Sequence, residues 1–416
     1  SVTQGLLVQR ASEFLERATY VSNDLSSYQD SLNIKVKNQT DLVNKYGKMI
    51  LELNDQIRKV ECAGVERAND LRDTRNQILD ELGKLCKMDY TEDANGNVSV
   101  QIEGTDFVKG GTCYEIGLQV DETTGFYTPF WPQNANYTIM SDGSKKYDIR
   151  NAGVFDLDMQ ISSTLETDIG GLKATLLARG DHRANYSDIL KDYDSISQSI
   201  VMNMQAEFDQ LIHHVATKIN EVLSNACDPD RGYMCDKDGS PLQLFQKVTS
   251  DGWVKGQDAQ GNDVWNFMQE DIDSSETMYT LGNLRINANL LQEASMLGFR
   301  LADGQEDNET ANKLKAAFTE ESYHLNPNVQ KKTNFVNYYT DLVSQVANTG
   351  ARNKSIYLNQ QGTVEATYNA REQVVGVSSD EELATMIKFQ NAYNAASRYI
   401  NVISDMLEHI IKTLAI

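Results

Sequence analysis

The chain has 416 residues, of which 60 are acidic and 38 are basic, so its formal net charge is −22. A surface this acidic repels the phosphates of nucleic acids and the headgroups of anionic lipids, which argues against a polyanion-binding protein. No run of about 18 apolar residues occurs, and the start lacks the apolar core of a signal peptide. The sequence therefore predicts neither membrane insertion nor a cleavable signal peptide.

Residues 1–87 are predicted to form an N-terminal helical arm. Apolar and small residues recur there with a period of about 3.5, which is typical of one long helix packed along a narrow seam. The seam positions are Leu15, Ala18, Ser22, Leu25, Gln29, Leu32, Val36, Gln39, Val43, Tyr46, Ile50, Leu53, Ile57 and Val60. The polar members Ser22, Gln29 and Gln39 predict a loosely packed first half.

A second helix is predicted from Asn69 to about Cys86. Its apolar stripe contains Leu71, Ile78 and Leu82, and Arg75 falls on this stripe. Two interpretations are open for Arg75. It forms an ion pair with an acid of the neighbouring helix, which we favour, or it contacts another subunit.

The middle of the chain is predicted to be richer in strands. Residues 88–150 form a β-hairpin region, because Asn95-Gly96 is a tight-turn pair followed by alternating apolar residues. Residues 151–228 return to helix. Residues 229–304 contain turn-forming residues and two of the three tryptophans, which predicts an inserted β-rich domain.

The end of the chain has the clearest pattern. Residues 305–385 are predicted to form a C-terminal helical arm that packs with residues 1–87 and 151–228, and residues 386–416 form a terminal amphipathic helix. Nine uncharged positions of the last helix alternate spacings of three and four residues. These positions, called the terminal seam below, are Met386, Phe389, Tyr393, Ala396, Ile400, Ile403, Leu407, Ile410 and Leu414. Such a seam predicts binding to partner helices.

These elements predict an α+β fold that is predominantly α. A rod of long helices, similar to a coiled-coil bundle, is built from both ends of the chain, with a β-hairpin region and an inserted β-rich domain. Because the terminal seam lacks an evident partner in the chain, we expect the last 30 or so residues to be poorly packed against the rest of the chain or to borrow a contact from a neighbouring subunit.

The candidate metal and catalytic residues form no convincing site. Asp228, Asp230, Asp236 and Asp238 resemble a calcium loop, but the EF-hand spacing is not met, and we favour acids that form turns. There is no Gly-x-Ser-x-Gly elbow and no glycine-rich phosphate loop. We therefore predict no catalytic, cofactor-binding or metal-binding residue.

Two further pairs of residues leave alternatives open. His213 and His214 are adjacent on a helix and point to different faces, so we expect a surface or partly packed pair and no shared ion. Cys227 and Cys235 are close enough in sequence for a local disulfide, although free thiols are the interpretation we favour.

Segments of both arms resemble a known family. Residues 376–382, together with Phe389-Gln390-Asn391-Ala392-Tyr393, are similar to the C-terminal signature of the bacterial flagellar hook-associated protein 1 family, which forms the hook–filament junction. Residues 50–57 and 69–82 resemble that family's two N-terminal helical blocks, and Asp307-Asn308 resembles its later helix start.

The resemblance implies a structural subunit of the flagellum, needed for motility. Such a subunit is exported through the flagellar channel without cleavage and forms a ring that joins hook to filament. Its implied partners are like subunits, the hook subunit, the second junction protein or the filament, and an export chaperone on the C-terminal helix. Members normally begin with a short Asn-rich segment, so we expect this chain to be truncated at its N-terminus. The alternatives are another axial subunit, of hook or filament type, or an adhesin or hydrolase carried by the inserted domain.

Overall fold

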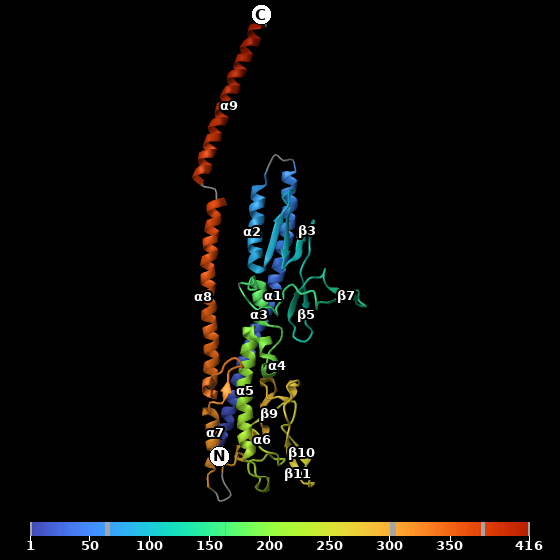
Figure 1. The fold of residues 1–416 in the computed structure, drawn as a ribbon, viewed down its shortest axis with the longest axis vertical. Coiled ribbons are helices and arrows are strands. Elements are labelled where there is room, and N and C mark those ends of the chain that lie inside the picture. Colours follow the sequence, from blue (N-terminus) through green and yellow to red (C-terminus); the bar gives the residue numbers. More distant parts are fainter. Residues whose placement is uncertain (1, 63–66, 163, 300–304, 376–378, 415–416) are drawn as a thin grey trace. The chain divides into compact units, whose positions relative to one another are not determined.

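The computed structural model describes residues 2–62, 67–162, 164–299, 305–375 and 379–414. Within these ranges, the side chains at positions 2, 374, 375, 379–382, 405 and 407–414 are not described. The chain divides into two compact units, Ser1–Leu342 and Val343–Ile416, and each is described here by itself (Figure 1).

Helix α1 (Val2–Glu61) is the longest element of the first unit (Figure 1). Its 60 residues make a helix of about 90 Å at 1.5 Å per residue. Of the predicted seam positions only Val60 is exposed, so the prediction of one long helix with a narrow seam is confirmed.

The prediction that the first half of the seam is loosely packed holds at Ser22 and Leu25, which are only half-buried, but it fails at Gln29. Gln29 is completely buried, and its Nε2 atom donates to the carbonyl oxygens of Arg179 and His182 at 2.7 and 2.8 Å. Its Oε1 atom accepts from Gln205 at 3.1 Å. A polar seam residue is therefore a specific hydrogen-bonded link between α1 and a distant segment.

The second helix and the first sheet lie at the end of α1. Helix α2 (Asn69–Leu85) packs on α1 and leads into an antiparallel sheet in the order β1-β2-β3-β4, which confirms the predicted hairpin. Its strands are β1 (Met88–Glu92), β2 (Val98–Ile102), β3 (Thr105–Lys109) and β4 (Thr112–Cys113). The sheet lies so close to α1 that a Cβ on Gly47 would come within 2.4 Å of the Phe107 ring.

Arg75 is buried between α1, α2 and the hairpin turn, with 1% of its surface exposed. Its Nη1 atom donates to Asn54 Oδ1 at 2.9 Å and to the Gly96 carbonyl at 2.6 Å, and its Nη2 atom lies 3.2 Å from Glu92 Oε1. The predicted intrachain ion pair exists, but the acid comes from β1, whereas the neighbouring helix supplies an amide. A subunit contact is excluded because the chain itself buries the guanidinium.

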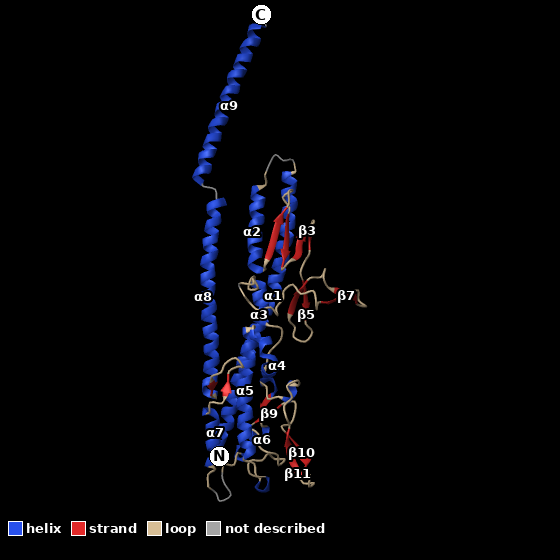
Figure 2. Ribbon diagram, in the orientation of Figure 1, coloured by secondary structure: helices blue, strands red, loops and turns tan. Residues whose placement is uncertain are grey.

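Figure 2 shows that the remaining strands of the first unit are short and paired. Two hairpins continue the first sheet region, formed by β5 (Gly117–Val120) with β6 (Tyr127–Phe130) and by β7 (Asn136–Ile139) with β8 (Lys145–Asp148). The helical return consists of α3 (Gly171–Arg179), α4 (Tyr186–Ser197) and α5 (Ile200–Asn225). Most residues of α5 are buried, so it is a core helix of this unit.

The segment that follows α5 shares its core with the helices. It contains the pairs β9 (Phe245–Lys247) with β12 (Leu284–Ile286) and β10 (Trp253–Gln257) with β11 (Asp263–Phe267), and the short helix α6 (Ala288–Gln292). Its apolar side chains lie in one cluster with those of α1, α5 and the start of α8. Whether residues 229–304 are a separate domain, and the division of the chain into six segments, stay predictions.

The last described elements are mostly helical. They are α7 (Asn308–Thr319), β13 (Tyr323–His324), β14 (Lys332–Thr333), α8 (Phe335–Val375) and α9 (Ser379–Leu414). Phe335, Tyr338 and Leu342 of α8 are buried in the core of the first unit, whereas every residue from 351 to 373 is exposed. The predominantly α, α+β class is confirmed. Among the described helices none combines the length and apolar content that a bilayer crossing requires.

Candidate assembly surface

The terminal seam lies on α9, as predicted. No glycine or proline interrupts the sequence between Ser379 and Leu414, so one continuous helix is favoured locally. Spacings of three and four residues put the seam positions on one face of this helix. The helix is described from Ser379 onward, and the side chain of Ser379 and residues 376–378 lie outside the described part.

The described seam side chains are exposed to solvent. Phe389 is 71% exposed, Tyr393 75% and Ile400 64%, and Met386, Ala396 and Ile403 are exposed as well. The side chains of Leu407, Ile410 and Leu414 are outside the description, but their backbone is helical. Contiguous exposed apolar surface of this kind marks an interaction site.

The chemistry of the seam suits an apolar helix as partner. None of its positions carries a charge, and the charged residues Lys388 and Arg398 lie between seam positions in the sequence. Each large seam residue contributes about 1.5–3 kcal/mol when it is fully buried against a partner. The arrangement can therefore drive association, but it contains no nucleophile paired with a base.

A second exposed apolar stripe, on α8, was missed by the sequence reasoning. Tyr357, Val364 and Tyr368 are exposed and spaced by seven and four residues, which places them on one helical face. Their spacing was visible in the sequence, but neutral and polar residues between them weaken the pattern. This stripe lies in the same unit as the terminal seam.

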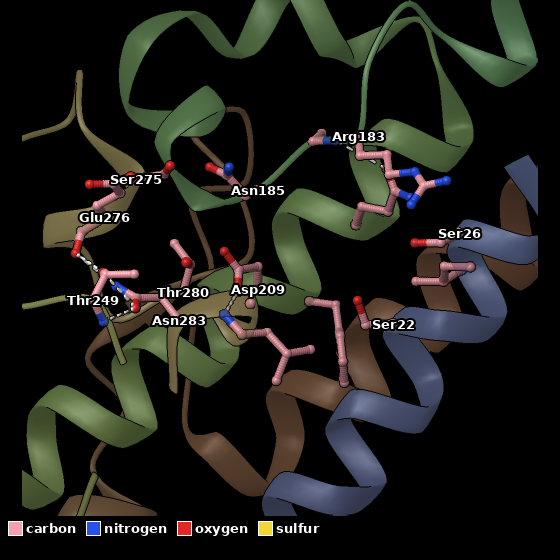
Figure 3. Close-up of a pocket in the computed structure, with 16 residues that line it drawn as sticks. Ser22, Ser26, Arg183, Asn185, Asp209, Thr249, Ser275, Glu276, Thr280 and Asn283 are labelled. Atoms are coloured by element: carbon pink, nitrogen blue, oxygen red, sulfur yellow. Dashed lines mark hydrogen bonds between the residues drawn. The ribbon is translucent and has the colours of Figure 1, made fainter. Parts of the chain in front are cut away.

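The first unit has an open pocket of about 380 Å³ between α1, α5 and the segment that contains Thr249 and Asn283 (Figure 3). Asn283 Oδ1 accepts from the Thr249 backbone N–H at 3.0 Å, and its Nδ2 atom donates to the Glu276 carbonyl at 2.9 Å. The carboxylate of Asp209 accepts from the backbone N–H groups of Leu281 and Tyr186 at 2.6 and 2.9 Å. These groups hold neighbouring segments together, which is a structural role.

The buried carboxyl group of Asp209 is expected to make stability depend on pH. Burial raises its pKa from 3.8 to about 6, although two backbone N–H donors oppose the shift. The folded state therefore binds the proton of Asp209 more tightly than the unfolded state does. Proton binding stabilises the fold fully below about pH 4, and this stabilisation is lost as the pH rises through about 6. Between these limits the protein should lose about 2–3 kcal/mol of unfolding free energy relative to Asp209→Asn.

Urea denaturation at a series of pH values measures this difference. Asp24→Asn, which changes an exposed acid on α1, is the control and should follow the unmodified protein. Parallel curves for the unmodified protein and Asp209→Asn would contradict the prediction.

His213 and His214 are partly packed, which is one of the two arrangements expected from the sequence. His213 is buried and its Nε2 atom lies 2.7 Å from Glu270 Oε2, whereas the ring of His214 lies 4.8 Å from that of Tyr323. Burial lowers the pKa of His214 to about 4. Both rings also pack against Tyr186, with centroid distances of 4.3 Å for His213 and 5.4 Å for His214, so the two imidazoles share an aromatic neighbour.

The acidic residues that resemble a calcium loop form hydrogen bonds within the chain. Asp236 accepts from the side-chain amides of Asn287 and Asn289, and Asp238 accepts from the Ser240 backbone and hydroxyl. In the part of the chain that the structure describes, no group of three or more His, Cys, Asp or Glu residues is arranged to hold a metal ion. These contacts agree with turn-forming acids.

Comparison with known proteins adds an independent line of evidence. The family model for the flagellar hook-associated protein FlgK helical domain matches residues 1–234, more than half of the chain. The model for the flagellar basal body rod FlgEFG protein C-terminal region matches residues 373–413, which include eight of the nine seam positions. Both arms of the chain are therefore covered.

Curated relatives agree with these matches. Flagellar hook-associated protein 1 of Bacillus subtilis (strain 168) is 24% identical over 432 residues, which cover 99% of this chain and 72% of that protein. The Escherichia coli (strain K12) protein of the same name is 22% identical over 405 residues, covering 91% and 71%. The flagellar hook junction protein FlgK from Burkholderia pseudomallei is 16% identical with a TM-score of 0.39, and the match covers 59% of this chain and 36% of that one. On the family match over residues 1–234, the chain belongs to the flagellar hook-associated protein FlgK family.

Proposed function

We propose that this chain is a structural subunit of the bacterial flagellum that joins hook to filament as part of a ring of like subunits. The observation that supports this most directly is the exposed, uncharged terminal seam of α9. The names of the curated relatives, flagellar hook-associated protein 1, agree with this role. The role is structural and needs no catalytic step.

The physical basis is the contrast between the seam and the rest of the chain. A net charge of −22 keeps separate subunits soluble and apart. The terminal seam is the uncharged apolar face on which that repulsion is weakest, so helices of like subunits, of the hook subunit and of the second junction protein or filament pack there. A dedicated chaperone covers the same face before export, and export proceeds without cleavage of a signal peptide.

A second candidate is another axial subunit, of hook or filament type. The match of residues 373–413 to the rod-type C-terminal model favours a terminal helix of a kind that axial proteins share. The two candidates differ in the product of assembly, because a junction protein forms short rings and a hook or filament subunit forms long tubes. An adhesin or hydrolase role for residues 229–304 is the weaker alternative, because this segment shares its apolar core with the helices.

The test is complementation of a bacterial strain that lacks its own hook-associated protein 1. The full chain should restore attached filaments and swimming, and its deletion variant lacking residues 386–416 should not. The deletion variant should still show cooperative thermal unfolding, because the core of the first unit ends at Leu342. Swimming with the deletion variant, or long tubes formed by the full chain, would overturn the proposal.

A further inference from the structure

Cys227 and Cys235 flank a closed loop directly after α5. The backbone N–H of Asp228 donates to the Tyr233 carbonyl at 2.8 Å, and the N–H of Tyr233 donates back to the Asp228 carbonyl at 3.0 Å. Gly232 turns the chain with a φ of 61°. These bonds hold the ends of the loop together, and the two Sγ atoms lie 2.7 Å apart.

We propose that Cys227 and Cys235 form an intramolecular disulfide when the chain meets an oxidising small-molecule disulfide such as oxidised glutathione. Disulfide sulfurs lie about 2.05 Å apart, so the two atoms need to approach by only about 0.7 Å. The backbone hydrogen bonds between Asp228 and Tyr233 already hold the two cysteines close to each other. The other cysteines are Cys62 at the end of α1, Cys86 after α2 and Cys113 in β4, all outside this loop.

The reaction is two successive thiol–disulfide exchanges. Cys227 is half-buried and Cys235 is buried, so the Cys227 thiolate attacks first and expels one glutathione thiolate. Cys235 Sγ, which contacts the Tyr233 carbonyl at 3.2 Å, then loses its proton to solvent and attacks Cys227 Sγ. The second glutathione leaves as its thiolate. The two cysteines lose two protons and two electrons in total, and oxidised glutathione takes both electrons.

The rate of the first exchange is expected to depend on pH. Burial and the neighbouring thiol raise the pKa of Cys227 to about 12, so only a small fraction is thiolate at neutral pH. The rate should therefore rise by about tenfold for each pH unit between about pH 7 and about pH 9.

The cross-link fastens the end of α5 to two neighbouring helices. Tyr233 donates its hydroxyl to Asp307, the N-cap of α7, at 2.6 Å, and Asp236 accepts from Asn287, the N-cap of α6, at 2.7 Å. Tyr233 lies within the loop between the cysteines, and Asp236 directly follows Cys235. Oxidation should therefore raise the thermal midpoint of the full chain by a few degrees.

The test uses the full chain, first reduced completely and then incubated with oxidised glutathione. After acid quenching, unfolding and alkylation, peptide mass spectrometry should find Cys227 joined to Cys235, with Cys86 and Cys113 alkylated. Recovery of both loop cysteines in alkylated form, or of Cys227 as a lasting mixed disulfide with glutathione, would overturn the proposal. So would a bond from either one to another cysteine.

Two variants serve as controls. Cys235→Ser should trap glutathione on Cys227, and its thermal midpoint should no longer respond to oxidant. Cys113→Ser should oxidise at the loop as the unmodified chain does. Peptide mapping of the unmodified chain decides the question even if Cys235→Ser folds poorly.

Discussion

Arg75→Ala is expected to lower the free energy of unfolding of the first unit by about 3–5 kcal/mol. The guanidinium of Arg75 is 1% exposed and binds groups from three elements: Asn54 on α1, the turn at Gly96 and Glu92 on β1. Alanine removes these donors, including the one that binds the Gly96 carbonyl, and leaves a cavity among buried side chains. Urea denaturation followed by circular dichroism measures the change.

Two other variants separate the effect of the cavity from the effect of the lost hydrogen bonds, and both from the effect of removing an arginine at an exposed position. Arg75→Met keeps much of the volume without the hydrogen bonds, so it should cost less than alanine if the cavity is a large part of the effect. Arg10→Ala removes an arginine that is 69% exposed and pairs with Glu13 at 2.8 Å, and it should leave stability almost unchanged. Equal midpoints for Arg75→Ala and Arg10→Ala would contradict the buried network.

The local elements of the fold could be predicted because their signals are local. The period of α1, the apolar stripe of α2 and the Asn95-Gly96 turn each lie within a few residues of the structure that they specify. The partners of the buried polar side chains could not be predicted. Gln29 binds Arg179 and Arg75 binds Gly96, and no spacing rule connects segments 150 or 21 residues apart.

The candidate site likewise has a part that the sequence predicts and a part that it does not. The nine positions of the terminal seam followed from spacing and lack of charge alone, and the described ones lie exposed on one helix. The stripe of Tyr357, Val364 and Tyr368 escaped notice because two tyrosines about three helical turns apart, with one valine between them on the same face, are a weak signal. The partner of either surface could not be predicted, because the spacing of residues on a helix specifies its apolar face and carries no information about the face that complements it.

Replacing Phe389 and Ile400 together by aspartate is expected to abolish incorporation of the chain into flagella. Each side chain contributes about 2 kcal/mol when its exposed apolar surface becomes buried, so losing both weakens association by about a thousandfold. Two carboxylates at the centre of an apolar helix interface add a desolvation cost. Immunoblots of purified hook structures from the complemented strain, with the amount of subunit in the medium, measure incorporation.

Val402→Asp is the matched control, because it also replaces an exposed apolar residue of α9 by aspartate. Position 402 lies two residues after Ile400, about 200° around the helix, and so away from the terminal seam. If general solubility or helix stability controlled assembly, Val402→Asp would fail to incorporate into flagella, just as the double variant with aspartate at positions 389 and 400 is expected to fail. If the seam is the contact, Val402→Asp should incorporate normally while the seam variant stays out of the hook. Normal incorporation of the seam variant would show that the subunit is held through another face, and the stripe at Tyr357 and Tyr368 would then be the next surface to change.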